Sequence, residues 1–166
     1  MTYAVHSLPG AQPVANTNTT QAHVLGTIIQ ATDPTYGAGE FIYLQGVAST
    51  IVGSVVEYNS SYQTGLYSIA TQKPDALAVA MSICTASYYG WYQIAGLAQI
   101  AKATSTSFAA DAYLGATSGL AVAAVSGLRL SGAVVALVAS AVSATAPDLV
   151  TVMVNRPTGP AIIQGT

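Results

Sequence analysis

The alternation of apolar and polar residues indicates β-strands along most of the chain beyond residue 24. In "EFIYLQG", residues 40–46, Phe41 and Tyr43 fall on one side, and Ile42 and Leu44 fall on the other. Successive side chains of a strand point to opposite faces of a sheet. The segment is therefore predicted to be a strand.

Other segments carry strand signals of different kinds. The run "LVTVMV", 149–154, alternates in the same way, and "STIVGSVVEY", 49–58, is rich in β-branched residues, which fit a pleated surface. Short apolar runs bounded by turn residues predict further strands at 24–33, 66–71 and 76–84.

Turn signals recur about every 8 to 12 residues, which is the spacing typical of a β-sandwich or β-barrel. In the later half they are Asp111, Gly115, Ser118-Gly119 and Ser126-Gly127. The Ala-rich segment 131–146 could instead hold one short helix, because Ala is the best helix former. We expect an all-β chain that forms a compact β-barrel or jelly-roll-like β-sandwich.

The first 23 residues differ from the rest of the chain. They contain Pro9, Gly10, Pro13 and the polar run "NTNTTQ", and few large apolar residues recur with any period. This composition is typical of an extended arm, either disordered or ordered on a partner, and we expect it to be dispensable for folding. The predicted organisation is an N-terminal arm at 1–23, a β domain at 24–157 and a C-terminal tail at 158–166.

The segment "SYYGWYQIAGLAQIAKA", 87–103, holds four aromatic residues within five positions. A helix is disfavoured because Gly90 and Gly96 would each weaken it by about 1 kcal/mol. We predict two strands with a bend or bulge at Gly96. The aromatic residues are interpreted as a buried or subunit-facing cluster, with a sugar-stacking platform as the alternative: Tyr88, Tyr89, Trp91 and Tyr92.

The composition limits the functional classes. Only 6% of the residues are charged and 52% are hydrophobic, whereas an ordinary soluble domain has about 25% charged residues. We infer that neighbouring subunits cover much of the surface. The cations are too few and too dispersed for nucleic-acid binding, and the longest apolar run, 132–147, is too short and interrupted for a spanning helix.

No pattern of catalytic or ligand-binding residues emerges. The six acids show no spacing that recommends a carboxylate pair, and both histidines, His6 and His23, lie in or beside the arm. One cysteine, Cys84, and two distant histidines cannot form a structural zinc site. We therefore predict a protein that is not an enzyme and has no catalytic residue, cofactor or metal.

Four segments form a recognisable series along the chain: "LGTIIQATDPTYGAGEFIYLQGVASTIVGSVVEYN", "YYGWYQIAGLAQIAKA", "FAADAYLGATSGLAVAA" and "DLVTVMVNRP". Together they resemble the head decoration (cement) proteins of tailed bacteriophages and their close virion relatives. The Gly-Trp-x-Gln-Ile-x-Gly element and the "VMVNRP" element are the more specific parts. The resemblance covers roughly residues 25–157 and includes no catalytic signature.

The resemblance implies a compact β domain, often a homotrimer, on the outer face of a capsid. Its partners would be the major capsid protein and itself, with neither nucleic acid nor membrane. It would be located on the exterior of the virion head after assembly in the host cytoplasm. The arm, with Tyr3, His6 and Pro9, is then the candidate capsid contact.

Two other classes remain open. A tail-tube, sheath or minor shell subunit would share the low charge but form hexameric rings. A carbohydrate- or ice-binding module would need an exposed aromatic or Thr-rich face, and no regular Thr-x-Thr ladder appears beyond Thr104-Ser105-Thr106.

Overall fold

The computed structural model describes residues 3–5, 8, 10–124, 128–137 and 148–160, and nearly all of its regular secondary structure there is β-strand. One 3-10 turn, η1, is the only helical element of the described residues. The all-β prediction is therefore confirmed. The elements are β1 (Ala4–Val5), β2 (Thr17–Asn18), β3 (Ile28–Asp33), β4 (Gly37–Gln45), β5 (Val55–Tyr58), β6 (Thr64–Leu66), η1 (Ile69–Thr71), β7 (Ala76–Ala80), β8 (Tyr89–Ala101), β9 (Leu114–Thr117), β10 (Leu120–Ala123), β11 (Ser131–Val135) and β12 (Leu149–Thr158).

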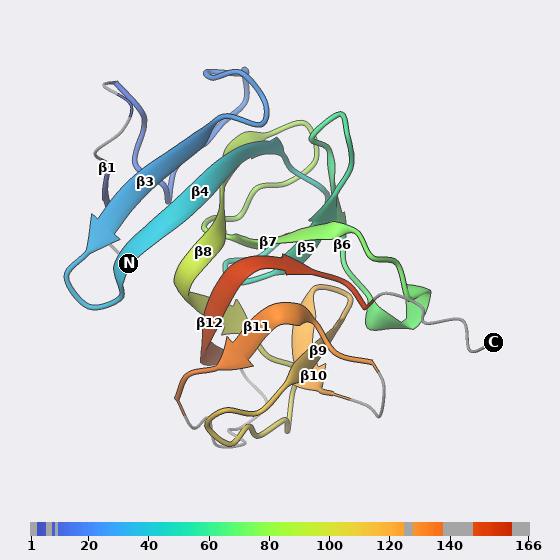
Figure 1. Ribbon diagram of the computed structural model, residues 1–166. Helices are drawn as coiled ribbons and strands as arrows, with labels where there is room; N and C mark the ends of the chain where they lie inside the picture. The colour runs from blue at the N-terminus through green and yellow to red at the C-terminus, as the bar shows by residue number, and fades with distance from the viewer. Residues whose placement is uncertain (1–2, 6–7, 9, 125–127, 138–147, 161–166) are drawn as a thin grey trace.

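Ten strands form one antiparallel sheet with the order β1-β3-β4-β8-β12-β7-β5-β6, and β2 and β11 pair with β8 and β12. The β9–β10 hairpin is a separate two-stranded sheet. The large sheet bends without closing into a barrel, and β9 and β10 pack against its lower half (Figure 1). The architecture is that of a β-sandwich.

The strand β8 connects the two halves of the molecule. Its first half pairs with β4, from Gln45↔Tyr89 to Glu40↔Ala95, and its second half pairs with β12, from Asn155↔Ala95 to Leu149↔Ala101. Gly96 lies at the change of partner with a φ of +100°. The predicted bend at Gly96 is confirmed, but the two expected strands are one continuous strand.

The strand β4 has the predicted alternation, and both of its faces are buried. Phe41 and Tyr43 belong to one core cluster, and Ile42 and Leu44 belong to another. A third, larger cluster fills the lower half between β12, β8, β7 and the β9–β10 hairpin. These clusters position the surfaces considered below.

Some boundaries differ from the sequence predictions. The segment 66–71 is not one strand, because β6 ends at Leu66 and η1 follows with buried Ile69. Within 49–58 only the last four residues form a strand, β5. Gly115, predicted in a turn, lies inside β9. Ser126-Gly127 and most of the 131–146 segment lie outside the described residues, although 131–135 is strand β11.

The strand β12 continues through Pro157 beyond the predicted stop. A register shift opposite Gly132 leaves Asn155, Arg156 and Pro157 between the pairs Ala133↔Val154 and Ser131↔Thr158. Arg156 has a left-handed φ of 45° there. This bulge accommodates Pro157, because proline has no backbone N–H to donate to a hydrogen bond between strands. The first tail residue, Thr158, pairs with Ala76 at the start of β7.

Candidate functional site

The four aromatic residues singled out from the sequence do not form one cluster. Trp91 and Tyr92 are both fully buried, but they point to opposite faces of β8 and belong to different clusters. Tyr89 is half-buried and stacks on Tyr43 with ring centroids 6.4 Å apart. Tyr88 precedes the strand and is 38% exposed. Alternation along the strand separates them, so only Tyr88 can contact a partner through a substantial exposed area.

The Trp91 ring lies in an aromatic group with two side chains from distant segments. Its centroid is 5.0 Å from that of Tyr43 and 5.4 Å from that of His23. Among the described residues, the buried Trp91 Nε1 has no hydrogen-bond acceptor. The complete burial of Trp91 and Tyr43 identifies this group as part of the core. Burial was one of the two placements expected for Trp91 from the sequence, and it leaves no open ring face on which a sugar could stack.

Tyr92 lies in the opposite cluster beside Cys84. Burial raises the pKa of Tyr92, and the neighbouring Cys84 thiol raises it further. Burial also raises the pKa of the Cys84 thiol, which disfavours the reactive thiolate. Both groups therefore serve packing at neutral pH.

The N-terminal segment is packed on the sheet where the structure describes it. Strand β1 pairs with β3, and β2 pairs with β8. Tyr3 and Val14 are buried in the cluster of Phe41 and Trp91, and the Tyr3 hydroxyl donates to the Leu97 carbonyl at 3.4 Å. Burial, followed by the Asp33 carboxylate, raises the pKa of Tyr3 to about 12.

This placement differs from the expected free arm. Tyr3, a candidate capsid contact from the sequence, is only 6% exposed, and its ring packs edge-on against Phe41 with centroids 4.8 Å apart. Its partners are residues of its own chain, because an apolar ring gains more from burial than from solvent exposure. His6 and Pro9, the other two arm candidates, lie outside the described residues.

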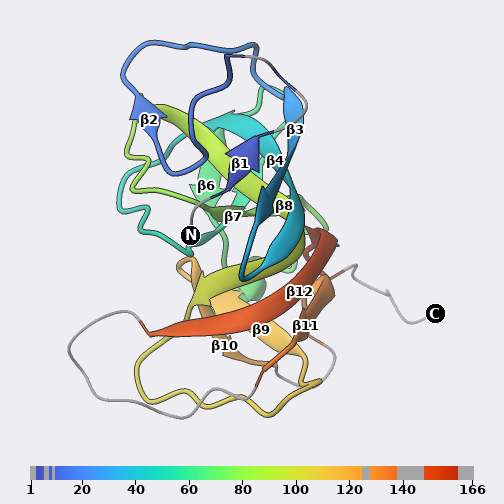
Figure 2. The same cartoon turned by 90° about the vertical axis from the view of Figure 1, so that its left-hand side faces the viewer.

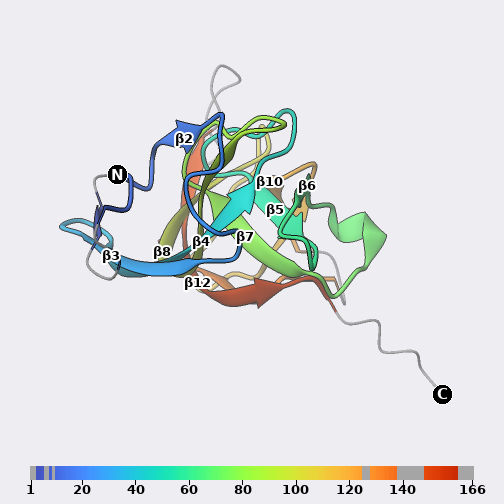
Figure 3. The same ribbon diagram turned by 90° about the horizontal axis from the view of Figure 1, so that it is seen from above.

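Four loops meet around the end of β4 and form a surface that we call the loop end. They are residues 22–27, 46–54, 59–63 and 82–88. The Tyr62 ring lies over Gly26, where an added Cβ would come within 2.3 Å of it. Gln45 N donates to the Tyr62 carbonyl at 3.0 Å, and Gly46 N donates to the Tyr88 carbonyl at 2.8 Å. The loop end is at the top of Figure 1 and faces the viewer in Figure 3.

The chemistry of the loop end is unusual because its loops contain no Asp, Glu, Lys or Arg. Large apolar or aromatic side chains are exposed instead: Val24 at 76%, Ile83 at 61%, Val52 and Tyr88 at 38% and Tyr62 at 37%. They come from all four loops. Exposed apolar groups gathered at one end are typical of a protein contact surface. The sequence singles out only Tyr88, because the four loops come together only through the fold.

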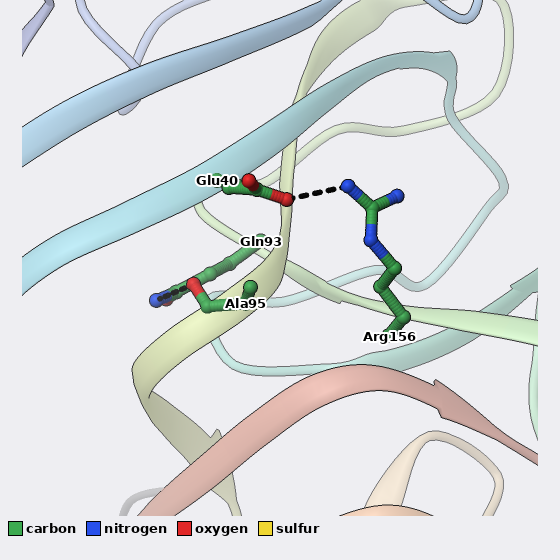
Figure 4. Close-up of polar contacts among 4 residues, drawn as sticks. All are labelled: Glu40, Gln93, Ala95 and Arg156. Carbon is green, nitrogen blue, oxygen red and sulfur yellow. Dashed lines mark hydrogen bonds and ion pairs between the residues drawn. The ribbon is translucent and has the colours of Figure 1, made fainter.

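A groove of about 380 Å³ runs across β3, β4, β8 and β12 at the bend of β8. Arg156 Nη2 donates to Glu40 Oε2 at 2.6 Å across this groove (Figure 4). The buried Gln93 amide donates to the carbonyls of Ala95 and Leu97, each at 3.1 Å. The ion pair joins residues far apart in sequence, and its arginine is 60% exposed, so its contribution to stability is small.

A second hollow, which we call the polar hollow, has a volume of about 530 Å³ at the β5–β6 hairpin. Glu57, Asp75 and Lys73 line it together with Asn59, Gln63 and Tyr58. Burial raises the pKa of Glu57, the Lys73 ammonium lowers it, and the Asp75 carboxylate raises it again. The spacing of Glu57 and Asp75 in the sequence does not indicate that they lie together. The β5–β7 register brings them together, because Glu57 opposes Leu77, two residues beyond Asp75.

Within the described ranges, no three His, Cys, Asp or Glu residues are grouped as a metal site would require. No helix in that part of the chain is long and apolar enough to cross a membrane.

Comparisons with protein-family models, curated proteins and solved structures found no match to this chain.

Proposed function

We propose that this chain is a structural virion protein that binds the outer surface of a tailed-phage capsid as a decoration (cement) protein and stabilises the head. The observation that carries the proposal is the loop end, which exposes Val24, Tyr62, Ile83 and Tyr88 on loops without ionic side chains. The resemblance of segments within 25–157 to decoration proteins gives the class of partner. The sandwich beneath supports these loops on paired strands, so the surface needs little ordering on docking.

A contact of this kind can stabilise a shell by mass action. A ligand that binds only the native assembly shifts its unfolding by an amount that grows with affinity, and several linked contacts add avidity. An uncharged contact loses little to charge desolvation, and salt screens it little. The loop end therefore suits a protein that must stay bound to a head under varying ionic conditions.

The proposed partners are the major capsid protein and further copies of this chain in a homotrimer on the head exterior, after assembly in the host cytoplasm. Nucleic acid and membrane are not among them. The four cations support the exclusion of nucleic acid, because they are few and spread along the chain. Lys102 contacts Asp148 in the interior, Arg156 pairs with Glu40, Arg129 covers the Tyr113 ring, and Lys73 lines the polar hollow.

The test is sedimentation of the purified protein with phage heads that lack their decoration protein. We expect wild type to sediment with the heads, and Ile83→Glu to bind at least tenfold more weakly because a charge would be buried at the contact. The control is Leu137→Glu, since Leu137 is 62% exposed and Ile83 is 61% exposed. Equal binding by wild type and Ile83→Glu would remove the loop end as the contact, and absence of wild-type binding would remove the proposed function.

The same purified protein also distinguishes a decoration protein from another structural virion subunit. A tail-tube, sheath or minor shell subunit would assemble into hexameric rings or cylinders, which negative-stain images of the purified protein would show. Free particles that add to the outside of heads support the decoration role instead.

A carbohydrate-binding module is the second candidate, and the polar hollow is the observation that favours it. Its carboxylates, amides and Tyr58 could accept and donate hydrogen bonds to sugar hydroxyls. A glycan array decides: a specific glycan whose binding is abolished by Asp75→Asn would support this candidate.

A further inference from the structure

The side of the lower sheet opposite the core carries a row of apolar residues across four neighbouring strands or strand ends. Met153 of β12 lies opposite Leu97 of β8 on one side and opposite Val134 of β11 on the other. Val134 in turn forms a bridge with Tyr113, just before β9. Leu149 lies on the same face of β12, four residues before Met153. We call these five residues the outer sheet face.

The register separates this face from the core. Val150, Val152 and Val154 of β12 are buried in the large cluster with Ala98 and Ile100 of β8. The intervening residues Leu149 and Met153 are 43% and 49% exposed, and Tyr113 is 50% exposed. In Figure 2, β12 crosses the lower half of the molecule in front of β9 and β10, which cover its core side.

An antiparallel sheet with one solvated face normally places polar residues on that face. Here the row is Leu, Met, Val and Tyr, and the polar residues between Leu149 and Met153 are uncharged. Thr151 accepts a hydrogen bond from Gln99 at 2.6 Å, so these two polar groups satisfy each other. On this face Gln99 and Ala101 are already buried, but Leu149, Met153 and Tyr113 remain exposed. The apolar row is therefore suited to further burial.

The lack of charge on this face favours a second copy as its occupant. Copies related by a symmetry axis bring the same residues close to one another, so an ionic side chain near the axis would meet a like charge. A face that binds a different protein commonly carries charge complementary to its partner. The ionic groups lie at the margins: the Arg156–Glu40 pair beyond Asn155, the Lys102–Asp148 pair beside Leu149, and Arg129 stacked 4.0 Å over the Tyr113 ring.

We infer that the outer sheet face is the contact through which a second copy of this chain packs in the proposed homotrimer, with Met153 near the shared axis. Apolar side chains of packed sheets interdigitate, and the flexible Met153 side chain can adapt to its counterparts. The inference rests on the proposed function for its biological setting. It adds that copies of the chain contact one another through one surface and contact the capsid through another. The lower strands carry the former, and the loops of the upper half carry the latter (Figure 2).

Native mass spectrometry and sedimentation velocity of the full chain test this inference. We expect wild type to form a multimer, and Met153→Glu to give particles of one 16.8 kDa chain at concentrations where wild type is fully associated. Its far-UV circular dichroism should match wild type. The matched control is Ile83→Glu, which introduces the same charge at the loop end and should keep the multimer. A monomeric wild type, or a multimer that survives Met153→Glu, would overturn the inference.

Cross-linking keeps the inference testable if Met153→Glu does not fold. In Met153→Cys the native Cys84 is buried and unreactive, so a short bismaleimide should join position 153 of two copies in high yield. The Ile83→Cys variant should give no comparable product. Equal yields from the two variants would contradict self-contact at the outer sheet face. Loss of head binding in Ile83→Glu with an intact multimer shows that the two surfaces act separately.

Discussion

At the scale of single residues, Glu57 shows how a chain with few charges accommodates an acid in a sheet. Its carboxylate lies over Gly65 of the neighbouring strand, where an added Cβ would be 3.2 Å from Oε1. Glu57 Oε2 is buried and has no hydrogen-bond partner within the described part of the chain. Glycine opposite Glu57 leaves room for the carboxylate, but the surroundings favour its neutral form.

Glu57 therefore predicts a specific dependence of stability on pH. Burial raises its folded-state pKa above the ordinary value of 4.5, so the folded state binds this proton more tightly than the unfolded state. Its stabilising contribution is present below pH 4.5 and is lost as pH rises through the raised pKa. Glu57→Gln should remove this loss and stabilise the protein at pH 7 by about 1 kcal/mol, measured by urea unfolding from pH 4 to 8.

The matched control is Glu40→Gln, which makes the same chemical change at the exposed ion pair with Arg156. This variant should retain the wild-type decrease in stability above pH 4.5. A Glu57→Gln variant with the same pH profile as wild type would show that the carboxylate is well solvated in the folded state.

At the scale of elements, the bend of β8 depends on Gly96. A Cβ there would lie 2.5 Å from the Ala38 carbonyl and 3.1 Å from Gly39 Cα, and both obstacles are backbone. The φ of +100° adds a conformational cost for any other residue. The bend lets one strand pair with β4 and then with β12.

Gly96→Ala should lower the free energy of unfolding by about 3 kcal/mol, combining left-handed backbone strain with overpacking. Gly37→Ala is the control, because Gly37 also has a positive φ of +73° but nothing within 4 Å of an added Cβ. It should cost about 1 to 2 kcal/mol. Equal losses in thermal denaturation would mean that strand β4 moves aside without cost.

The same elements show what the sequence could and could not predict. The alternation in 40–46 and 149–154 and the bend at Gly96 follow from local patterns, and the structure confirms them. Whether 87–103 is one strand or two depends on partners that lie far away in sequence. The loop end could not be predicted, because its exposed residues Val24, Tyr62 and Ile83 lie on loops that are far apart in the sequence and come to one end only through the fold.

At the scale of the whole molecule, the N-terminal segment covers one side of the upper sheet. Tyr3 and Val14 complete the cluster of Phe41 and Trp91. The sequence did not predict this packing, because residues 1–23 show no hydrophobic periodicity. Two apolar residues, Tyr3 and Val14, are enough to reach the cluster. The segment therefore contributes to folding as well as to the surface.

Deletion of residues 1–20 should lower the free energy of unfolding by about 3 to 6 kcal/mol, from loss of burial at Tyr3 and Val14 and exposure of Phe41. Chemical denaturation of the purified truncation measures this loss. The full-length double variant Tyr3→Ala with Val14→Ala should reproduce most of it. Wild-type stability in the truncated chain would restore the interpretation of a dispensable arm.

The change of partner along β8 also imposes an order on biosynthesis. Its first half can join β4 as soon as both have been translated, whereas its second half pairs with residues 149–155. A nascent chain arrested on the ribosome before that point would hold Ala98 and Ile100 uncovered on an unpaired edge, a state prone to aggregation. The upper half can take shape early, but the lower sheet must wait for some fifty further residues of translation.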